Sequence, residues 1–301
     1  MITPPAIDSP LGTIDYDERG AGPTLVLVPG SCSTGAAWRP VIGQWHDRYR
    51  CVTTSLLGYG RTTERRTAAT ADMAYEAEML EAVIRRASAQ GGATPVHLVG
   101  HSFGGTTALA VALRGRVPVQ SLTVIEPPMP ELLRHLGEHG PYAAFREMTD
   151  AYFDSFRNGN AAAIETMIDF YGGAGTFAGW PQKVRDYAVA TTAANLLDWT
   201  CAYSFHLTNA SLARIEIPTL VVRGAASHPA MKRATELLAR GLADSRLATI
   251  PGAAHFMIST HAKSVADEIE RHVASADSTP AEAFTTRDDY PVPAGIQRRQ
   301  I

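Results

Sequence analysis

The segment Gly100-His101-Ser102-Phe103-Gly104-Gly105 contains the side chain best suited to covalent chemistry in this sequence. An apolar run at 96–99 precedes it, and an Ala-rich segment at 106–113 follows it. This order predicts a strand, a tight turn and a helix, with the glycines permitting a sharp backbone reversal. Ser102 would stand at the tip of the turn, near the free N–H groups of a helix start, which favour an anion. The context therefore indicates a nucleophilic serine rather than an incidental residue of a Gly-rich turn.

The elements around this motif alternate between strand and helix patterns, which predicts right-handed βαβ units in a mostly parallel sheet. The predicted strands are 13–18, 24–28, 50–55, 96–99, 121–125, 219–222 and 246–250. The predicted helices are 36–45, 71–87, 104–113, 231–243 and 263–274. The nearly continuous apolar runs at 24–28 and 122–125 suit a sheet that is covered on both faces.

The segment 129–213 has a different composition, because it is rich in aromatic and Met residues and lacks clear β-branched runs. We expect a helical insertion here, which leaves residues 1–128 and 214–274 as the core domain. Residues 275–301 carry prolines and charges without a helical or strand period. They are predicted to form an extended C-terminal tail on the surface.

Five features in the expected order make residues 12–274 resemble the α/β-hydrolase fold superfamily. Val26-Leu27-Val28-Pro29-Gly30-Ser31, with Trp38 after it, resembles the family's His-Gly-x loop, and 55–62 (SLLGYGRT) resembles its Asp-x-x-Gly-x-Gly-x-Ser segment. The other three are the Gly-x-Ser-x-Gly turn, the helical insertion after the sixth strand, and the loop 250–256 (IPGAAHF). The resemblance implies a mostly parallel eight-stranded sheet flanked by helices, with residues 129–213 as a helical cap.

The resemblance implies that His255, in the loop 250–256, is the general base. The residue follows a short strand and precedes the last predicted helix. A histidine titrating near neutral pH can take the proton of Ser102 and later give it to a leaving group. His101 is expected to point away from the serine hydroxyl, because residues on either side of a sharp turn diverge.

The acid of the expected triad departs from the commonest family pattern. That pattern places Asp where this sequence has Ser227, and a serine cannot hold an imidazolium by charge. A subset of the superfamily, including haloalkane dehalogenases and zearalenone-type lactone hydrolases, takes its acid from the end of an earlier strand, and the resemblance to the superfamily therefore points to Glu126 at such a strand end. Since the carboxyl ends of parallel strands meet in one crevice, Glu126 can reach His255. Asp244, or a Ser–His pair without an acid, remains an alternative.

The expected oxyanion hole consists of two backbone N–H groups. One should come from Phe103, and the other from Ser31, with the neighbouring Cys32 as the option if the loop is shifted. The hydroxyls of Ser31 and Ser33 could add a third donor. Cys32 has no basic neighbour and is interpreted as a small packed thiol.

Aromatic residues of the insertion should form the roof of a substrate pocket, although most of them will be ordinary helical core. The predicted pocket residues are Cys32, Tyr152, Phe156, Trp180, Trp199 and Phe256. Such a lining favours a substrate that is apolar or aromatic around its scissile group.

These residues together imply a serine hydrolase that needs no cofactor and no metal and cleaves a carboxylic ester or lactone through an acyl-enzyme. C–C bond hydrolase, thioesterase, amidase, and perhydrolase or lyase chemistry on the same triad stay open. A weakly catalytic ligand-binding receptor is the alternative from another class. Haloalkane dehalogenase and epoxide hydrolase chemistry is disfavoured, because those enzymes carry Asp at the position of Ser102.

The 301-residue composition, 45% hydrophobic and 19% charged, suits one large α/β domain or two small ones. A net charge of -3 argues against nucleic acid or an anionic membrane as the main partner, so a small-molecule substrate is expected, with a homodimer possible. Cys32, Cys51 and Cys201 have no metal or disulfide spacing, which favours a cytoplasmic location. We find no signal-peptide pattern and no membrane-spanning apolar run.

Overall fold

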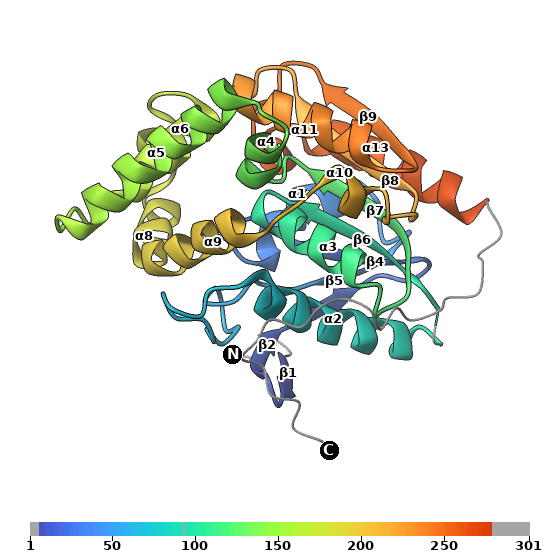
Figure 1. Cartoon of the computed structure of the whole chain (residues 1–301). Coiled ribbons are helices and arrows are strands. Elements are labelled where there is room, and N and C mark those ends of the chain that lie inside the picture. Colours follow the sequence, from blue (N-terminus) through green and yellow to red (C-terminus); the bar gives the residue numbers. More distant parts are fainter. Residues whose placement is uncertain (1–5, 93, 279–301) are drawn as a thin grey trace.

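The computed structural model describes residues 6–92 and 94–278 and shows helices on both faces of one twisted sheet (Figure 1). The strands are β1 (Ala6–Ser9), β2 (Gly12–Asp15), β3 (Asp17–Arg19), β4 (Thr24–Val28), β5 (Arg50–Thr53), β6 (Val96–His101), β7 (Val119–Ile125), β8 (Thr219–Gly224) and β9 (Ser245–Ile250). The main sheet has the order β3-β5-β4-β6-β7-β8-β9. Its strands are parallel except β3, which runs antiparallel to β5.

The helices before β7 and after β8 are the ones associated with the core domain that contains this sheet. They are the 3-10 helix η1 (Gly35–Trp38), α1 (Arg39–Ile42), α2 (Met73–Gln90), α3 (Phe103–Arg114), α11 (Pro229–Gly241), α12 (Met257–Thr260) and α13 (Ala262–Asp277). In the part of the chain that the structure describes, no helix has both the length and the apolar character needed to cross a bilayer.

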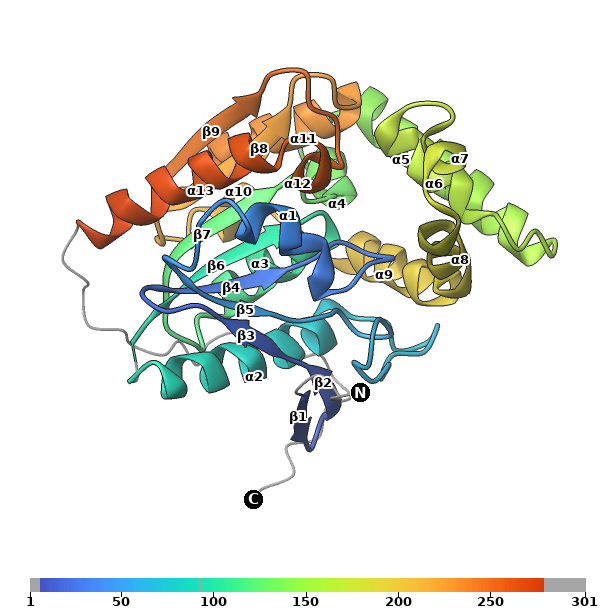
Figure 2. The same ribbon diagram turned by 180° about the vertical axis from the view of Figure 1, so that it is seen from behind.

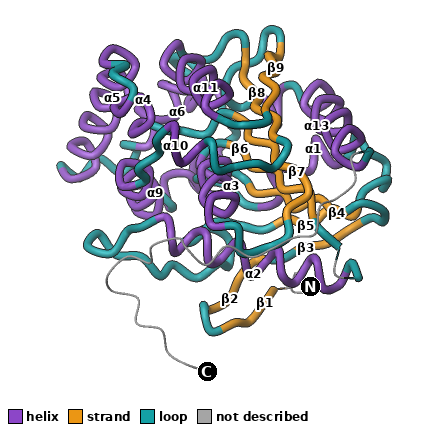
Figure 3. Tube along the Cα trace, turned by 45° about the vertical axis from the view of Figure 1, so that its right-hand side comes forward, coloured by secondary structure: helices purple, strands orange, loops and turns teal. Residues whose placement is uncertain are grey.

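Successive residues of β4 show how the sheet divides the core. Val26 and Val28 face a cluster that includes α2, α3 and α11, whereas Leu25 and Leu27 face a cluster with α1, α12 and α13. Figure 2 shows α1 and α13 on the second face, and Figure 3 shows the two helical layers on opposite sides of the strands. Both faces are therefore buried, as the apolar runs predict.

Between β7 and β8 the chain is helical, as expected from its composition. This segment contains α4 (Pro130–His135), α5 (His139–Arg157), α6 (Ile164–Gly172), α7 (Thr176–Gly179), α8 (Gln182–Ala190), α9 (Thr192–Ser204) and α10 (Asn209–Leu212). Side chains of α6, α8 and α9 share a cavity with Gly30 and Ser102, which follow β4 and β6. These helices therefore lie beside the carboxyl ends of the central strands (Figure 1).

Some predicted boundaries agree with the structure and others do not. The strand at 24–28 is β4, but the strand predicted at 13–18 is interrupted at Tyr16 and divides into β2 and β3. Because β2 pairs with β1 in a separate hairpin closed beside Gly12, the main sheet has seven described strands rather than eight. Residues 275–277 belong to α13, not to a tail, and the rest of the predicted tail, from 279, lies outside the described residues.

Candidate active site

Ser102 lies at the tip of the turn between β6 and α3, with a positive φ of +53°. Close packing makes glycine necessary around it. A Cβ on Gly104 would lie 2.3 Å from the carbonyl oxygen of Pro29, and one on Gly100 would lie 2.4 Å from the carbonyl oxygen of Gly104. The N–H of Ser102 donates to the Ile125 carbonyl (2.8 Å), which holds the tip against β7. The turn thus presents the serine side chain at the start of α3.

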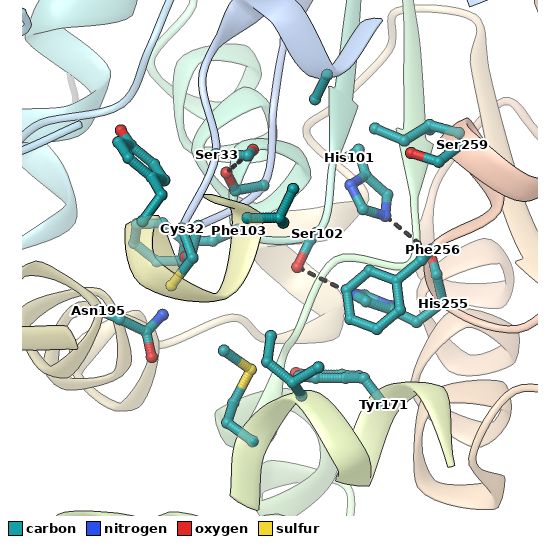
Figure 4. Close-up of a pocket in the computed structure, with 18 of the residues that line it drawn as sticks. Cys32, Ser33, His101, Ser102, Phe103, Tyr171, Asn195, His255, Phe256 and Ser259 are labelled. Atoms are coloured by element: carbon teal, nitrogen blue, oxygen red, sulfur yellow. Dashed lines mark hydrogen bonds between the residues drawn. The ribbon is translucent and has the colours of Figure 1, made fainter. Parts of the chain in front are cut away.

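His255, in the loop after β9, directs its imidazole at this serine (Figure 4). Its Nε2 lies 2.9 Å from the Oγ of Ser102. The residue is only 2% exposed, and its ring stacks on Tyr171 of α6 with the centroids 4.1 Å apart. Phe256 packs against the same ring edge-on, at 5.3 Å. Aromatic contacts from two segments therefore hold the imidazole in this orientation.

Glu126, directly after β7, supplies a carboxylate to the other ring nitrogen. Its Oε2 lies 2.8 Å from the Nδ1 of His255, and its Oε1 accepts from the N–H of Gly224 (2.8 Å). Burial raises the pKa of the fully buried Glu126, but the hydrogen bonds from His255 and Gly224 outweigh it and leave the pKa below its ordinary value. A carboxylate here keeps a proton on Nδ1 and leaves Nε2 free to accept the proton of Ser102.

The other positions considered for the acid do not offer a charge to this imidazole. Ser227 is buried and carries only a neutral hydroxyl, which lies beside the Glu126 carboxylate and helps to lower the pKa of Glu126. Asp244 precedes β9, and its carbonyl accepts from the N–H of Thr219 at the start of β8. It therefore lies at the opposite end of the strands from His255. The structure brings together Ser102, His255 and Glu126, the three residues singled out in the sequence.

His101 points away from the serine hydroxyl, as the sharp turn predicts (Figure 4). Its Nε2 lies 2.9 Å from the carbonyl oxygen of His255, so it supports the loop that carries the base. Burial, together with the neighbouring His255, lowers the pKa of His101 to about 3. This histidine is therefore neutral at physiological pH and acts as a hydrogen-bond donor to the loop.

The loop after β4 lies against Ser102, since a Cβ on Gly30 would be 2.8 Å from the serine Cβ. Ser31, Cys32 and Phe103 all line the cavity beside it. The Ser31 hydroxyl donates to Asp198 of α9 (2.5 Å), and that of Ser33 donates to the Gly30 carbonyl (2.8 Å). The idea that these hydroxyls add a third oxyanion donor was therefore wrong, because both are engaged elsewhere. Burial raises the pKa of the Cys32 thiol to about 12, as expected for a packed thiol.

A cavity of about 890 Å³ opens onto Ser102 and His255. Four of the six predicted pocket residues line it, namely Cys32, Trp180, Trp199 and Phe256. The prediction was wrong for Tyr152 and Phe156, which are not among its lining residues. Both belong to α5, which packs against α6 and α11, so α6 rather than α5 provides that part of the wall.

Comparison with known proteins agrees with this architecture. The sequence model of the α/β hydrolase fold matches residues 23–262. The chain belongs to the α/β hydrolase fold family.

Relatives of this α/β hydrolase fold protein have varied names. It is 29% identical over 249 residues to the polyketide synthase ThaQ of Burkholderia thailandensis, which is 80% of this chain and 11% of the synthase. It is 30% identical over 113 residues to the N-formylmaleamate deformylase of Pseudomonas putida, covering 36% of this chain and 39% of that protein. The chain thus spans well under half the length of these two curated relatives.

Among solved structures, an esterase from Thermogutta terrifontis is similar, with a TM-score of 0.70. The alignment covers 91% of this chain and 99% of that chain at 20% identity. At this identity the likeness concerns the α/β hydrolase fold.

Sequence reasoning missed several residues of this α/β hydrolase site. Met167, Ile168 and Tyr171 of α6 line the cavity, as do Asn195 and Asp198 of α9. On α6, Tyr171 lies four residues after Met167 and three after Ile168, and on α9 Asp198 lies three residues after Asn195. Such spacing places side chains on one face of a helix and could have indicated these residues. The same spacing occurs on helix faces that pack into the core, however, so spacing alone does not indicate which face lines a cavity.

Proposed function

We propose that this protein is a serine hydrolase that cleaves a carboxylic ester or lactone of an apolar or aromatic small molecule without a cofactor. The observation that carries the proposal is the line of contacts Ser102 Oγ–His255 Nε2 (2.9 Å) and His255 Nδ1–Glu126 Oε2 (2.8 Å) beside a large cavity. A serine hydroxyl is a weak nucleophile until an adjacent base accepts its proton, and this geometry supplies that base with an orienting acid.

The reaction would proceed in two halves. The Ser102 oxygen attacks the substrate carbonyl carbon while His255 Nε2 takes its proton, and Glu126 stabilises the imidazolium that forms. The tetrahedral intermediate collapses, His255 protonates the leaving oxygen, and an acyl-enzyme remains on Ser102. Water then attacks the acyl carbon, again giving a proton to His255. The carboxylic acid leaves, and the serine regains its proton.

The negative oxygen of each intermediate needs two preorganised donors. We assign them to the backbone N–H groups of Phe103 and Ser31. This assignment is supported by the position of both residues in the cavity wall and by the close approach of Gly30 to Ser102. Phe103 is the first residue of α3, so its N–H has no acceptor within the helix.

The substrate class follows from the wall of the cavity. Trp180, Trp199 and Phe256 line it, with Met167 and Ile168 from α6, which suits an apolar or aromatic group next to the scissile bond. In this proposal residues 129–213 act as a cap over Ser102. A lactone is included because Glu126 occupies the place of the acid in zearalenone-type lactone hydrolases, which the sequence resembles. We also propose a cytoplasmic location, which the three unpaired cysteines support.

A thioester is the second candidate for the scissile bond. The likeness over 80% of this chain to a segment of a polyketide synthase favours it. The same triad serves both bonds, because each reaction passes through a tetrahedral intermediate and an acyl-enzyme. Parallel assays with p-nitrophenyl hexanoate and hexanoyl-N-acetylcysteamine separate the two by their kcat/KM.

Labelling by a fluorophosphonate tests the nucleophile directly. We expect stoichiometric labelling of the wild-type protein, an adduct on Ser102 by mass spectrometry, and none in Ser102→Ala. Hydrolysis of p-nitrophenyl esters should disappear with the label. A wild-type protein that neither labels nor turns over these esters would support the ligand-binding receptor instead.

Replacing the acid tests the third member of the triad. Glu126→Gln keeps the shape of the side chain but can hold the wrong imidazole tautomer, so kcat should fall by about a thousandfold or more. Ser227→Ala is the comparison variant, because Ser227 occupies the usual acid position of the family. It removes a neutral hydroxyl beside Glu126 and should lower kcat far less than Glu126→Gln does. If Glu126→Gln keeps most of its activity, Glu126 is not the acid.

A further inference from the structure

Asn195 of α9 is a polar side chain that the proposed reaction does not use. It is 2% exposed and lines the same cavity as Ser102. Figure 4 shows its amide directed into the cavity, beside Cys32 and across from His255. The amide oxygen has no hydrogen-bond partner among the described residues. A buried amide oxygen without a donor is unfavourable, and such groups in native proteins call for a specific explanation.

The nearest polar side chain of the cavity along α9 is already engaged. Asp198, one turn further along α9, accepts from the hydroxyls of Ser31 and Tyr59 through Oδ2 and from Arg66 through Oδ1. Much of the cavity lining is apolar or aromatic, including Met167, Trp199 and Ala202. No described residue donates to the Asn195 oxygen, which leaves it free to accept from a molecule inside the cavity.

The chemistry of that partner is restricted by the amide. Its oxygen accepts a hydrogen bond and its NH₂ donates, so an alcohol or phenol hydroxyl can satisfy both groups at once. An anion is disfavoured by the carboxylate of Asp198, and the many apolar and aromatic side chains of the lining make any unpaired charge costly to bury. A hydroxyl on an otherwise apolar molecule fits both conditions.

We propose that Asn195 is a specificity-determining residue that binds a hydroxyl group of the substrate, so that the preferred ester or lactone is apolar or aromatic and carries a hydroxyl away from its scissile bond. This inference rests on the proposed function for the identity of the scissile bond. The recognition itself rests on the placement of Asn195.

The test compares isosteric substrates on two variants. One series is the p-nitrophenyl esters of 3- and 4-hydroxyphenylacetic acid against the 3- and 4-methyl analogues. The second is the hexanoates of 3- and 4-hydroxybenzyl alcohol against their methyl analogues, followed by chromatography. We expect at least one hydroxyl substrate to exceed its methyl partner in kcat/KM. Asn195→Leu should lower that ratio at least tenfold.

The matched control is Thr200→Val, which also replaces a polar side chain of α9. Thr200 donates to the Leu196 carbonyl within the helix and is not among the cavity-lining residues, so this variant should keep both the activity and the ratio. Tyr171→Phe is a second comparison, because the Tyr171 hydroxyl is also buried without a partner among the described residues. If Tyr171→Phe rather than Asn195→Leu removes the preference, the assignment to Asn195 is wrong.

Binding to the Ser102→Ala protein separates this inference from the proposed function. Calorimetry would compare methyl 3- and 4-hydroxyphenylacetate with the corresponding methyl-substituted esters, with and without Asn195→Leu. A hydroxyl preference that Asn195→Leu abolishes, in a wild type that hydrolyses nothing, would support Asn195 while refuting the hydrolase. Active wild-type protein without any hydroxyl preference, or an equal loss on both members of each pair, would overturn the assignment to Asn195.

Discussion

Two of the three proposed catalytic residues have a positive φ, which is unusual for a residue with a side chain. The φ angles are +53° at Ser102 and +45° at Glu126, and such conformations cost about 1–3 kcal/mol each in residues with a Cβ. Hydrogen bonds to neighbouring strands hold them, from the N–H of Ser102 to Ile125 and from the N–H of Glu126 to Val222. The strain turns both side chains away from their strand directions and toward the same imidazole. It is therefore part of how the site is assembled.

His101 should make stability depend on pH. Burial lowers its pKa from 6.5 to about 3, so between these values the unfolded chain binds a proton that the folded chain does not. Stability therefore falls as the pH is lowered through this window, by about 1.4 kcal/mol per pH unit for one proton. His101→Gln, whose amide can still donate to the His255 carbonyl, removes this contribution.

Urea unfolding of both proteins at pH 7 and pH 5 measures the effect. The free energy of unfolding should fall by about 1–2 kcal/mol more in the wild type than in His101→Gln over this interval. An equal fall in the two proteins would show that His101 titrates normally in the folded state.

The junction of β6 with α3 depends on close backbone packing. A Cβ on Gly104 would meet the carbonyl oxygens of Pro29 and Val28 at 2.3 and 2.7 Å, and backbone atoms cannot move aside as a flexible side chain can. The same packing places the loop after β4 against Ser102. This junction therefore sets the distance between the nucleophile and its proposed oxyanion donors.

Gly104→Ala should destabilise the protein by about 1–3 kcal/mol through overpacking, although alanine is the better helix former by about 1 kcal/mol. The matched control is Gly140→Ala in α5, where no described atom lies within 4 Å of the added Cβ. The control should be neutral or slightly stabilising. Chemical denaturation of both variants measures the difference, and similar stabilities would mean that the junction tolerates a side chain.

A buried ionic cluster joins the helical insertion to the rest of the molecule. Asp198 of α9 accepts from Ser31 after β4, from Tyr59 and from Arg66, at 2.5, 2.6 and 2.9 Å. Arg66, whose side chain is fully buried, also pairs with Glu76 of α2 at 2.9 Å. Three segments distant in sequence, α9, the loop after β4 and residues 59–66, thus meet around one carboxylate. The cluster couples the position of α9 to that of the proposed oxyanion loop.

Asp198→Asn should therefore affect both stability and activity. The amide has one oxygen for three donors, so at least one buried donor would lose its acceptor, at about 1–3 kcal/mol. The rate of fluorophosphonate labelling should fall as well, because Ser31 loses its anchor. Asp154→Asn is the matched control, since the Asp154–Arg157 pair on α5 is 68% exposed on both sides and should matter by less than about 0.5 kcal/mol. If Asp198→Asn and Asp154→Asn had equal effects on stability and labelling, Asp198 would not couple α9 to the loop that contains Ser31.

Local patterns were sufficient for much of the architecture. The alternation of β-branched and helical runs placed β4 at its observed bounds and indicated the helical character of the segment between β7 and β8. The division of the 13–18 strand was not visible, because the two halves differ only in the strand with which they pair. Pairing partners come from other parts of the chain, and no local pattern encodes them.

The sequence alone was enough to select Ser102 and His255, because a tight turn needs its glycines locally and a histidine loop lies between recognisable elements. Glu126 could be named from the sequence, but its contact with His255 joins residues 129 positions apart. The cavity wall was decided by packing: α6 rather than α5 lines the cavity, and Asn195 and Asp198 of α9 line it together with Ser102. A helix of given sequence can turn any face inward, and only the neighbours that it meets in the folded chain choose which side chains surround a substrate.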